Sequence, residues 1–477
     1  MTQQNGGQNM KKQDKVRPFG WRDKIGYMFG DFGNDFTFIF STTILMRFYT
    51  TVLGISTAVV GTVMMLSRFV DAFTDVAMGR ICDKSPVTKA GKFKPWILRM
   101  CVPVAAASFL VYQSALTGAS MTVKIVYLFV TYILWGSIFY TSINIPYGSM
   151  ASAISPEPSD RQSLSTFRTM GGVLAGMVIG IIVPIVTYQK IDGRETLIGS
   201  RVTATAAVFS VFAIICYLLC YFLVTERVTI NNTAEKKSVS TLQMLKNAVN
   251  NRALISIIAA SIVMLMSQLT MQGMSGYTFP DYYNNADAQS LSTVLMMLAM
   301  LIAAVSAKPL AAKIGKAEIS SYSNFFAAAV NLALFFIRPQ SVWVYCALQM
   351  LSWIGLGIFS MVSWALITDV IDHSEIINGV REDGSVYALY SFARKLGQAV
   401  AAGLTGWLLA FIGYNSLAAE QQVSQTPQVL SGIFNIATLV PTVGFALLAL
   451  ILKFWYPLTK AKVDENVKLL KEKHRKE

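Results

Sequence analysis

The sequence predicts an all-α membrane protein of twelve transmembrane helices, arranged as two bundles of six. Composition is the first reason: of 477 residues, 54% are hydrophobic and only 14% are charged, whereas soluble domains carry about 25% charged residues. The second is a series of twelve apolar runs, each at least about 18 residues long and therefore long enough to cross a bilayer. The third is a polar stretch, 225–252, which divides these runs into two equal sets.

The apolar runs follow one another along the chain with short polar loops between them. In the first half they are expected near 27–53, 55–82, 95–117, 122–150, 170–188 and 202–224. In the second half they are expected near 253–279, 291–312, 319–337, 341–370, 385–413 and 430–456. The resulting domains are a cytoplasmic N-terminal segment (1–24), an N-terminal bundle (25–224), a cytoplasmic linker (225–252), a C-terminal bundle (253–456) and a basic cytoplasmic tail (457–477).

Positive charge indicates the orientation in the membrane. Lys and Arg gather in the first 24 residues, the loop after the second run, the linker and the tail, whereas the loops 280–290 and 414–429 contain none. Because such residues accumulate on the cytoplasmic side, both termini are expected in the cytoplasm, with the protein in the plasma membrane. The polar N-terminal segment predicts no cleavable signal peptide. The same grouping explains the net charge of +14, so nucleic acid is not an expected partner.

Nothing in the sequence indicates catalysis. It has no Gly-rich phosphate loop, no nucleophile with a paired base and no His cluster with metal spacing. We therefore expect a transporter driven by an ion gradient, not an enzyme, and no cofactor. The five cysteines lie in or beside apolar runs and are expected to be free thiols. Similar basic loops follow the second and eighth runs. They suggest a duplicated six-helix unit with a substrate site at the membrane midplane between the halves. The alternative is that both loops are basic only because they lie on the cytoplasmic side.

Asp71 and Asp75 lie one helical turn apart inside the second apolar run. A charge at bilayer depth costs at least ~2.5 kcal/mol, so it usually serves a task. Arg68 shares their helix face because it is offset by three residues from Asp71, and Thr74 adds a hydroxyl. Such oxygen ligands suit a small cation such as Na⁺, and neighbouring carboxylates equally suit a proton. The alternative is that Arg68 neutralises one aspartate as a structural pair.

The first run contains two further acids one turn apart. Asp35, with Asn34 beside it, lies deep in the run and is expected to accept hydrogen bonds from substrate hydroxyls. Asp31 lies nearer the basic N-terminus and is expected at the interface or helix start. Arg47, near the outer end of the run, is expected to extend its charge to the membrane surface.

The fourth run combines polar and aromatic side chains around Pro146, namely Tyr140, Thr141, Asn144 and Tyr147. A proline loosens the helix, and polar groups at membrane depth are tolerated where they line an aqueous cavity. For any single hydroxyl, a contact between helices is the competing interpretation. The cluster as a whole favours a cavity.

The eleventh run places Ser391, Arg394, Lys395 and Gln398 within about two turns. Arg394 and Lys395 are adjacent and therefore point to different sides, so one of them is expected to face the interior and pair with aspartates. The alternative is a pair at the membrane surface that obeys the positive-inside rule. Trp364 in the tenth run is a candidate to stack on a sugar ring, although many such side chains only pack.

Several blocks of the chain, read in order, are GDFGNDF, RFVDAFTD, GRICDKS with GKFKPW, YILWG with NIPYG, and DVIDHSE with FARKLGQA. Together they resemble the glycoside, pentoside and hexuronide cation symporter family (melibiose permease-like), and the resemblance extends from about Gly26 to Trp455. It implies a major facilitator fold and cation-coupled sugar uptake by alternating access.

The resemblance also assigns roles to individual residues. Asp71, Thr74 and Asp75 match the cation site of the second helix, and Thr141 matches its contributor on the fourth. Asp35 matches the sugar-binding aspartate. The full set of expected site residues is Asp71, Thr74, Asp75 and Thr141 for the cation; Asn34, Asp35, Tyr140, Asn144, Arg168, Trp364, Ser391 and Lys395 for the substrate; and Arg68 and Asp83 for coupling or structure.

The chain departs from the family's pattern at four positions. Asn144 replaces an aspartate, Gly148 a tryptophan and Thr74 an asparagine, and Trp364 is displaced by about one turn. The lost carboxylate and aromatic ring indicate a substrate other than a galactoside, and one fewer negative charge favours an acidic sugar such as a hexuronide. Thr74 offers no amide oxygen for sodium, which shifts the expectation slightly toward protons.

The sequence therefore predicts a monomeric secondary transporter that couples H⁺ or Na⁺ to symport of a glycoside, pentoside or hexuronide across the lipid bilayer. Two alternatives remain open at this point. One is a lipid or lysolipid transporter on the same fold, and the other is a sugar sensor that binds without transporting.

Overall fold

The computed structural model describes residues 17–228, 251–378 and 383–476, and almost all of them are helical. Within that part of the chain, ten helical segments are long and apolar enough to cross a membrane. Two more helices, α1 (Trp21–Thr51) and α13 (Asp383–Phe411), have 31 and 29 residues, long enough for a span. Helix α1 contains Asp31 and Asp35, and α13 contains Arg394 and Lys395; these charged residues lower the hydropathy of the two helices. The predicted all-α membrane fold is confirmed.

The first half of the chain forms six of these segments. After α1, the helices are α2 (Thr57–Lys84), α3 (Lys94–Val111) with η1 (Ser114–Gly118), α4 (Met121–Tyr132) continued by η2 (Ile133–Tyr140) and α5 (Thr141–Ile154), α6 (Pro158–Thr187) and α7 (Gly199–Leu223). Between α6 and α7 the chain forms an antiparallel hairpin of β1 (Tyr188–Ile191) and β2 (Arg194–Leu197), which the sequence analysis did not predict.

The second half forms the other six. Its helices are α9 (Arg252–Tyr277) with η3 (Thr278–Tyr282), α10 (Asp287–Ile314), α11 (Lys316–Ile337), α12 (Val342–Asn378), α13, and α15 (Pro427–Leu450) with η4 (Ile451–Trp455). A short helix, α14 (Ser416–Glu420), precedes α15, and α16 (Lys460–Lys476) follows it as a polar extension. Each half has its own large hydrophobic core. The five cysteines are buried and free, as predicted.

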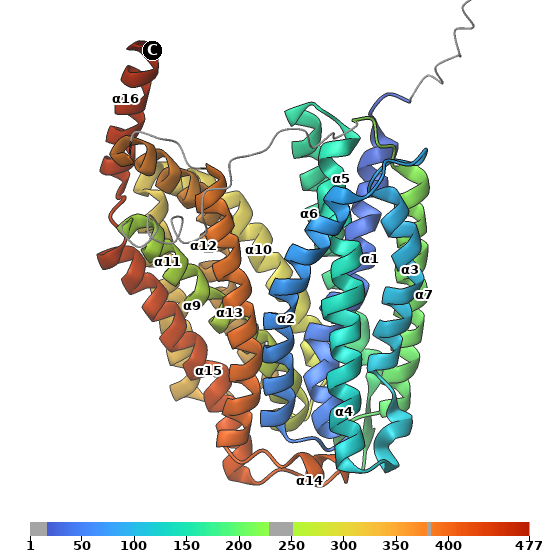
Figure 1. Cartoon of the computed structure of the whole chain (residues 1–477). Helices are drawn as coiled ribbons and strands as arrows, with labels where there is room; N and C mark the ends of the chain where they lie inside the picture. Colours follow the sequence, from blue (N-terminus) through green and yellow to red (C-terminus); the bar gives the residue numbers. More distant parts are fainter. Residues whose placement is uncertain (1–16, 229–250, 379–382, 477) are drawn as a thin grey trace, which may run out of the picture.

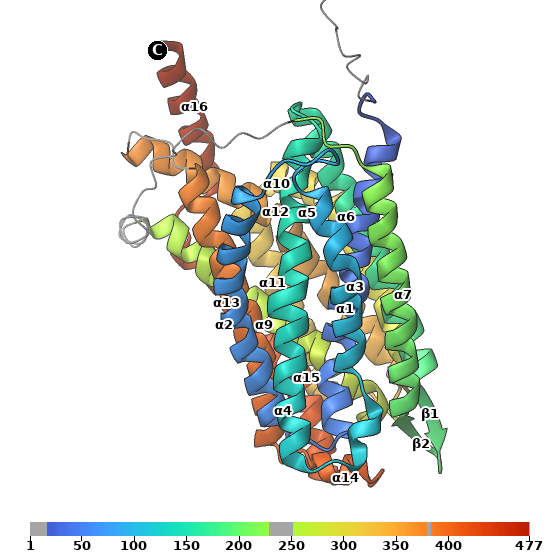
Figure 2. The same ribbon diagram turned by 45° about the vertical axis from the view of Figure 1, so that its right-hand side comes forward.

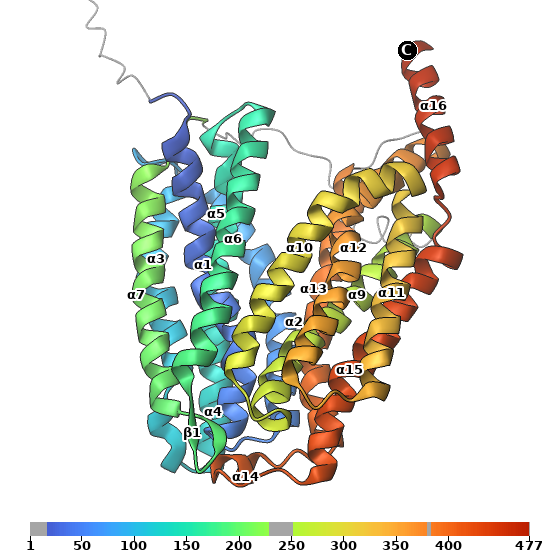
Figure 3. The same ribbon diagram turned by 180° about the vertical axis from the view of Figure 1, so that it is seen from behind.

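The two bundles stand side by side, and they approach each other closely at one end only (Figure 1). We call this end, which carries α14 and the β hairpin, the hairpin end; the other, which carries α16 and the start of α1, is the terminal end (Figures 2 and 3). Helix α2 packs on α13, and α6 packs on α10, across the boundary between the halves. Small residues permit this approach, since a Cβ added to Gly406 of α13 would lie 2.8 Å from the Cα of Gly61 of α2.

The start of the expected linker is bonded to the first half. The carboxylate of Glu226 accepts hydrogen bonds from the backbone N–H groups of Lys92 (2.7 Å), Phe93 (2.9 Å) and Lys94 (2.7 Å), where α3 begins. Those N–H groups have no partner within their own helix, so an acid at this position stabilises the helix start. The remainder of the linker, 229–250, lies outside the described residues.

Candidate functional site

The two acids of α2 face the fourth membrane segment. Ser137 of η2 donates to Asp71 Oδ1 at 2.5 Å, and Thr141 at the start of α5 donates to Asp75 Oδ1 at 3.0 Å. The two acids are four residues apart on α2, and their two partners are four residues apart on the fourth segment. The two segments therefore run parallel and present matching rows of oxygen atoms. Ser137 lies within the π-helical segment η2, which ends directly before Thr141. Such π-helical segments recur at functional sites. The sequence analysis named Thr141 but missed Ser137.

Each acid also has a cationic partner. Arg68 Nη1 donates to Asp71 Oδ2 at 3.2 Å, and the Lys395 ammonium bonds to Asp75 Oδ2. Arg68 comes from the same helix as the acids, and its bond to Asp71 is the pair that the structural alternative expected. Lys395 instead comes from α13, in the other half. The side chains of Asp71 and Asp75 remain 17% and 18% exposed, so neither acid is fully buried within the protein.

The hydroxyl of Thr74 lies beside these acids but donates within its own helix. Its partners are the carbonyl oxygens of Val70 (3.2 Å) and Asp71 (3.1 Å). Because the hydroxyl proton is used there, the oxygen lone pairs stay available to a cation. Within the described residues no group of three or more His, Cys, Asp or Glu side chains could hold a metal ion. The oxygen atoms around Asp71 and Asp75 are those of two carboxylates and the neighbouring hydroxyls.

A second polar cluster lies on α1 and α6. Arg168 Nε donates to Asp31 Oδ1 at 2.9 Å, and the guanidinium lies 5.3 Å from the ring centre of Tyr147. Gly172 makes room for both acids of α1, since a Cβ there would lie 2.8 Å from Asp35 Oδ2 and 3.3 Å from Asp31 Oδ2. The expectation that Asp31 lies at the interface or the helix start was wrong: it lies in mid-helix and holds Arg168. The sequence did carry a signal for this position, because Asp31 lies one helical turn from Asp35 and therefore shares its helix face.

The structure corrects the expectation for Asn34. Its side chain is 1% exposed and bonds to Asn144 (3.3 Å) and Tyr217 (2.9 Å). The amide therefore ties α1 to α5 and α7 and has almost no exposed surface for a substrate, whereas its partner Asn144 is half-buried. Tyr140 is also half-buried and stacks on Phe38 of α1 with ring centres 5.6 Å apart.

The candidate site residues of the second half point in two different directions. Lys395 reaches across to α2, and the adjacent Arg394 lies 5.7 Å from the ring of Trp364. Trp364 packs edge-on against Tyr390 at 5.3 Å and is 43% exposed. This divergence confirms that neighbouring positions on α13 face different sides. Ser391 is half-buried, and the substrate contacts expected of Ser391 and Trp364 stay predictions.

Asp83 lies near the end of α2 with an exposed side chain. Its main-chain carbonyl, not its carboxylate, accepts a hydrogen bond from Lys92 Nζ at 3.0 Å. Asp83 thus contributes to the loop before α3 through its backbone, and a coupling role of its carboxylate stays a prediction.

Comparisons with known proteins agree with this architecture. Residues 26–460 match the family model described as MFS/sugar transport protein. The chain is 32% identical over 451 residues to a glucuronide carrier protein homolog of Escherichia coli (strain K12), covering 94% of each chain. It is 28% identical over 448 residues to a putative glycoside/cation symporter of the same organism, covering 93% of each.

Solved structures share the fold at low sequence identity. A bacterial homolog of the human lysosomal transporter Spinster, in an inward-facing and unoccupied conformation, aligns with a TM-score of 0.66 and 9% identity over 94% of this chain and 97% of that one. With a family model that matches nearly the whole chain and two six-helix halves enclosing paired acids, the chain belongs to the MFS/sugar transport protein family.

Proposed function

We propose that this protein is a symporter of the plasma membrane that imports a glycoside, pentoside or hexuronide together with H⁺ or Na⁺, with both termini in the cytoplasm. The observation that carries this proposal is the ion pair of Lys395 with Asp75, because it joins the acids of one half to the other half. A cation that binds the acids competes with the Lys395 ammonium. Cation binding thus changes the contacts between the halves, as alternating access requires.

The oxygen atoms around Asp71 and Asp75 can take either coupling ion. The two carboxylates with the hydroxyls of Ser137 and Thr141 offer the hard ligands that Na⁺ prefers. A proton can instead be held by one carboxylate, since the hydroxyl beside it can reverse its hydrogen bond and accept. In both cases the positive charge that enters replaces Lys395 at Asp75.

Coupling to the sugar follows from the path between the two clusters. Thr141 bonds to Asp75, and the preceding residue, Tyr140, stacks on Phe38 of α1, three residues after Asp35. Ordering of this segment by a cation therefore also orders one wall of the proposed sugar site. By linkage, the sugar strengthens cation binding by the same free energy.

The first test is uptake by the purified protein in liposomes. We expect an inward proton gradient in sodium-free buffer to drive accumulation of a sugar substrate above its external concentration, because Thr74 supplies no amide oxygen for sodium. Accumulation only with a sodium gradient would reassign the ion and keep the symporter. Binding without flux under either gradient would instead identify a sensor, and flux of a lysolipid without sugar flux would identify a lipid transporter.

Arg168 supports a finer proposal, that the preferred substrate carries a carboxylate. Asp31 occupies the Nε side of the guanidinium, and the side chain is 40% exposed. Next to it Gly148 leaves open space, since a Cβ there would have Arg168 Nη1 at 3.9 Å as its one neighbour within 4 Å. The two Nη atoms form the edge that binds carboxylates in pairs of hydrogen bonds. A uronide carboxylate fits the space beside Gly148.

This finer proposal predicts a measurable preference. We expect the protein to bind 4-nitrophenyl β-D-glucuronide at least about tenfold more tightly than the matching glucoside, because hydrogen bonds to charged groups contribute about 1.5–3 kcal/mol. Arg168→Lys keeps the charge but loses the paired geometry, and should reduce that ratio several-fold. Binding to both compounds is measured by the shift of the melting temperature with ligand concentration. An equal affinity of the wild type for the two compounds would contradict a carboxylate subsite while leaving symport untouched.

A further inference from the structure

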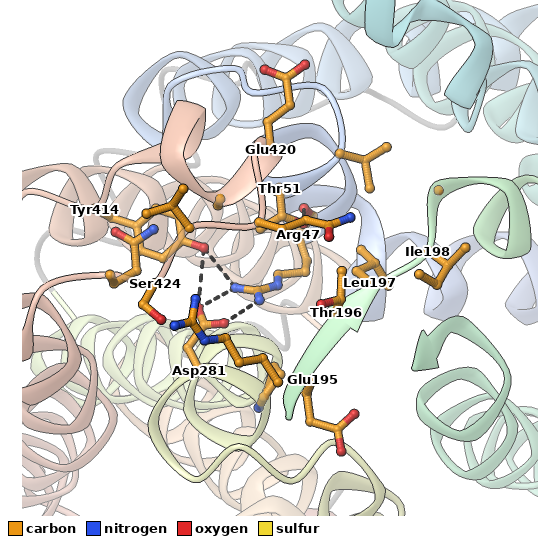
Figure 4. Close-up of a pocket in the computed structure, with 18 of the residues that line it drawn as sticks. Arg47, Thr51, Glu195, Thr196, Leu197, Ile198, Asp281, Tyr414, Glu420 and Ser424 are labelled. Carbon is orange, nitrogen blue, oxygen red and sulfur yellow. Dashed lines mark hydrogen bonds and ion pairs between the residues drawn. The ribbon is translucent and has the colours of Figure 1, made fainter. Parts of the chain in front are cut away.

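Arg47 of α1 lies at the hairpin end and is bonded to the second half of the chain. Its guanidinium donates to both carboxylate oxygens of Asp281 in η3, at 2.6 and 2.5 Å, and to the hydroxyl of Tyr414 at 2.9 Å. Figure 4 shows these three side chains converging. The side chains of Arg47 and Asp281 are 6% and 14% exposed. The expectation that Arg47 extends to the membrane surface was therefore wrong.

The pair lies between elements that belong to different halves. Arg47 is part of the first bundle, whereas Asp281 and Tyr414 follow α9 and α13 of the second. The ring of Tyr277 lies 4.8 Å below the guanidinium, and its hydroxyl is 2.9 Å from that of Thr50. These contacts cross the boundary at the end where the bundles meet.

Two further sets of contacts close the same end. Lys124 of α4 forms an ion pair of 2.8 Å with Glu420 of α14. Asn284, just after η3, donates to the carbonyl of Gly193 at 2.7 Å and accepts from the N–H of Glu195 at 2.8 Å in the β hairpin. The Lys124 pair is buried to a similar extent, whereas the Arg47 pair has two hydrogen bonds between the charged groups.

A polar cavity of about 520 Å³ adjoins the Arg47 pair. Both halves contribute to its wall, which includes Arg194 and Glu195 of the hairpin and Gln422 and Ser424 of the second half. Figure 4 shows Glu195 and Ser424 on different sides of the Arg47 pair. Water can therefore reach the two charged groups as soon as the halves begin to separate. A buried charge that loses its partner raises the free energy of the protein, whereas a hydrated charge does not. The pair therefore resists the first step of separation, and it comes apart once water reaches both groups.

We propose that Arg47, Asp281 and Tyr414 form an outer clasp, which holds the extracellular side shut and sets the resting balance between inward-facing and outward-facing states. The proposal rests on the alternating-access part of the proposed function and on the orientation proposed there. The clasp contacts exist only when the hairpin ends meet. Each contact therefore favours the inward-facing state and has no counterpart in the outward-facing one, which is the requirement for shifting a two-state equilibrium.

The test measures the separation of the hairpin ends directly, without substrate. Spin labels are placed on Met121→Cys of α4 and Gln428→Cys of α15, both at exposed positions, in full-length protein in lipid nanodiscs. The five native cysteines are buried. Electron paramagnetic resonance then gives the distance distribution between the halves. We expect Arg47→Ala and Asp281→Ala each to raise the long-distance population at least fivefold, and the exchanged pair Arg47→Asp with Asp281→Arg to return it to within about twofold of the wild type.

A matched control is the ion pair of Lys316 with Asp369, at 2.6 Å, which joins α11 to α12 inside one half. Lys316→Ala removes an equally close pair but should leave the distances unchanged. If the alanine variants at Arg47 and Asp281 do not fold, Tyr414→Phe removes two hydrogen bonds of the clasp, the one accepted from Arg47 and the one donated to Asp281, without changing charge. It should raise the long-distance population about twofold. Wild-type distances in every folded clasp variant would overturn the proposal. Because no substrate is present, that result is distinct from a failure of symport.

Discussion

Asp75→Asn is expected to abolish gradient-driven accumulation of sugar, by at least about a hundredfold, while sparing exchange of sugar across the membrane. The amide cannot neutralise an entering cation, and it leaves the Lys395 ammonium without its carboxylate. With no ion to bind and release, the carrier can still move sugar down its own gradient. The measurement is uptake by proteoliposomes under an imposed ion gradient, compared with exchange of labelled for unlabelled sugar in the absence of a gradient.

The matched control for Asp75→Asn is Asp464→Asn, which makes the same chemical change at an exposed position of α16, outside the two bundles. It should retain accumulation. The two carboxylates are therefore distinguished by position and not by chemistry. Full accumulation by Asp75→Asn would remove the basis of the proposed mechanism, because the contact between Lys395 and Asp75 is the one on which the mechanism depends.

Asp35→Asn should weaken sugar binding by about a hundredfold or more. Among the described residues the Asp35 carboxylate has no ion pair or hydrogen bond, although it lies half-buried against α6. Such a group is free to accept from two sugar hydroxyls, and each hydrogen bond to a charged group contributes about 1.5–3 kcal/mol. The amide keeps the shape but not the charge. Affinity is measured on the purified variant by calorimetry with the best sugar found for the wild type.

The cation site provides an internal control for Asp35→Asn. The variant should still melt at a higher temperature when the coupling ion is added, because Asp71 and Asp75 are unchanged. Loss of both sugar binding and that ion-dependent shift would mean that the fold was damaged. Unaltered sugar affinity with a normal ion response would place the sugar site elsewhere.

Part of the candidate site could be predicted from local periodicity. Residues offset by three and four positions share a helix face, so Arg68, Asp71 and Asp75 were grouped from the sequence, and Arg68 bonds to Asp71 in the structure. The same rule indicated that Arg394 and Lys395 diverge. It could not say which of the two reaches the first half, because that depends on how α13 is rotated against α2.

Two interpretations failed for a related reason. Asp31 and Arg47 were assigned to the membrane interface from their distance to the ends of the run. Their partners, Arg168 and Asp281, lie 137 and 234 residues further along the chain. Position along a helix indicates depth in the membrane, but it carries no information about a partner on another helix. Ser137 was missed because a single serine in an apolar run has no distinguishing pattern.

By itself the sequence determined the class of protein, the division into two bundles and the presence of paired acids inside an apolar run. These follow from the cost of exposing polar groups to lipid, which acts on each segment separately. Only the tertiary structure decided which charges pair, namely Lys395 with Asp75, Arg168 with Asp31 and Arg47 with Asp281. Ion pairs form between groups a few ångströms apart in space, and the packing of one helix against another sets that distance.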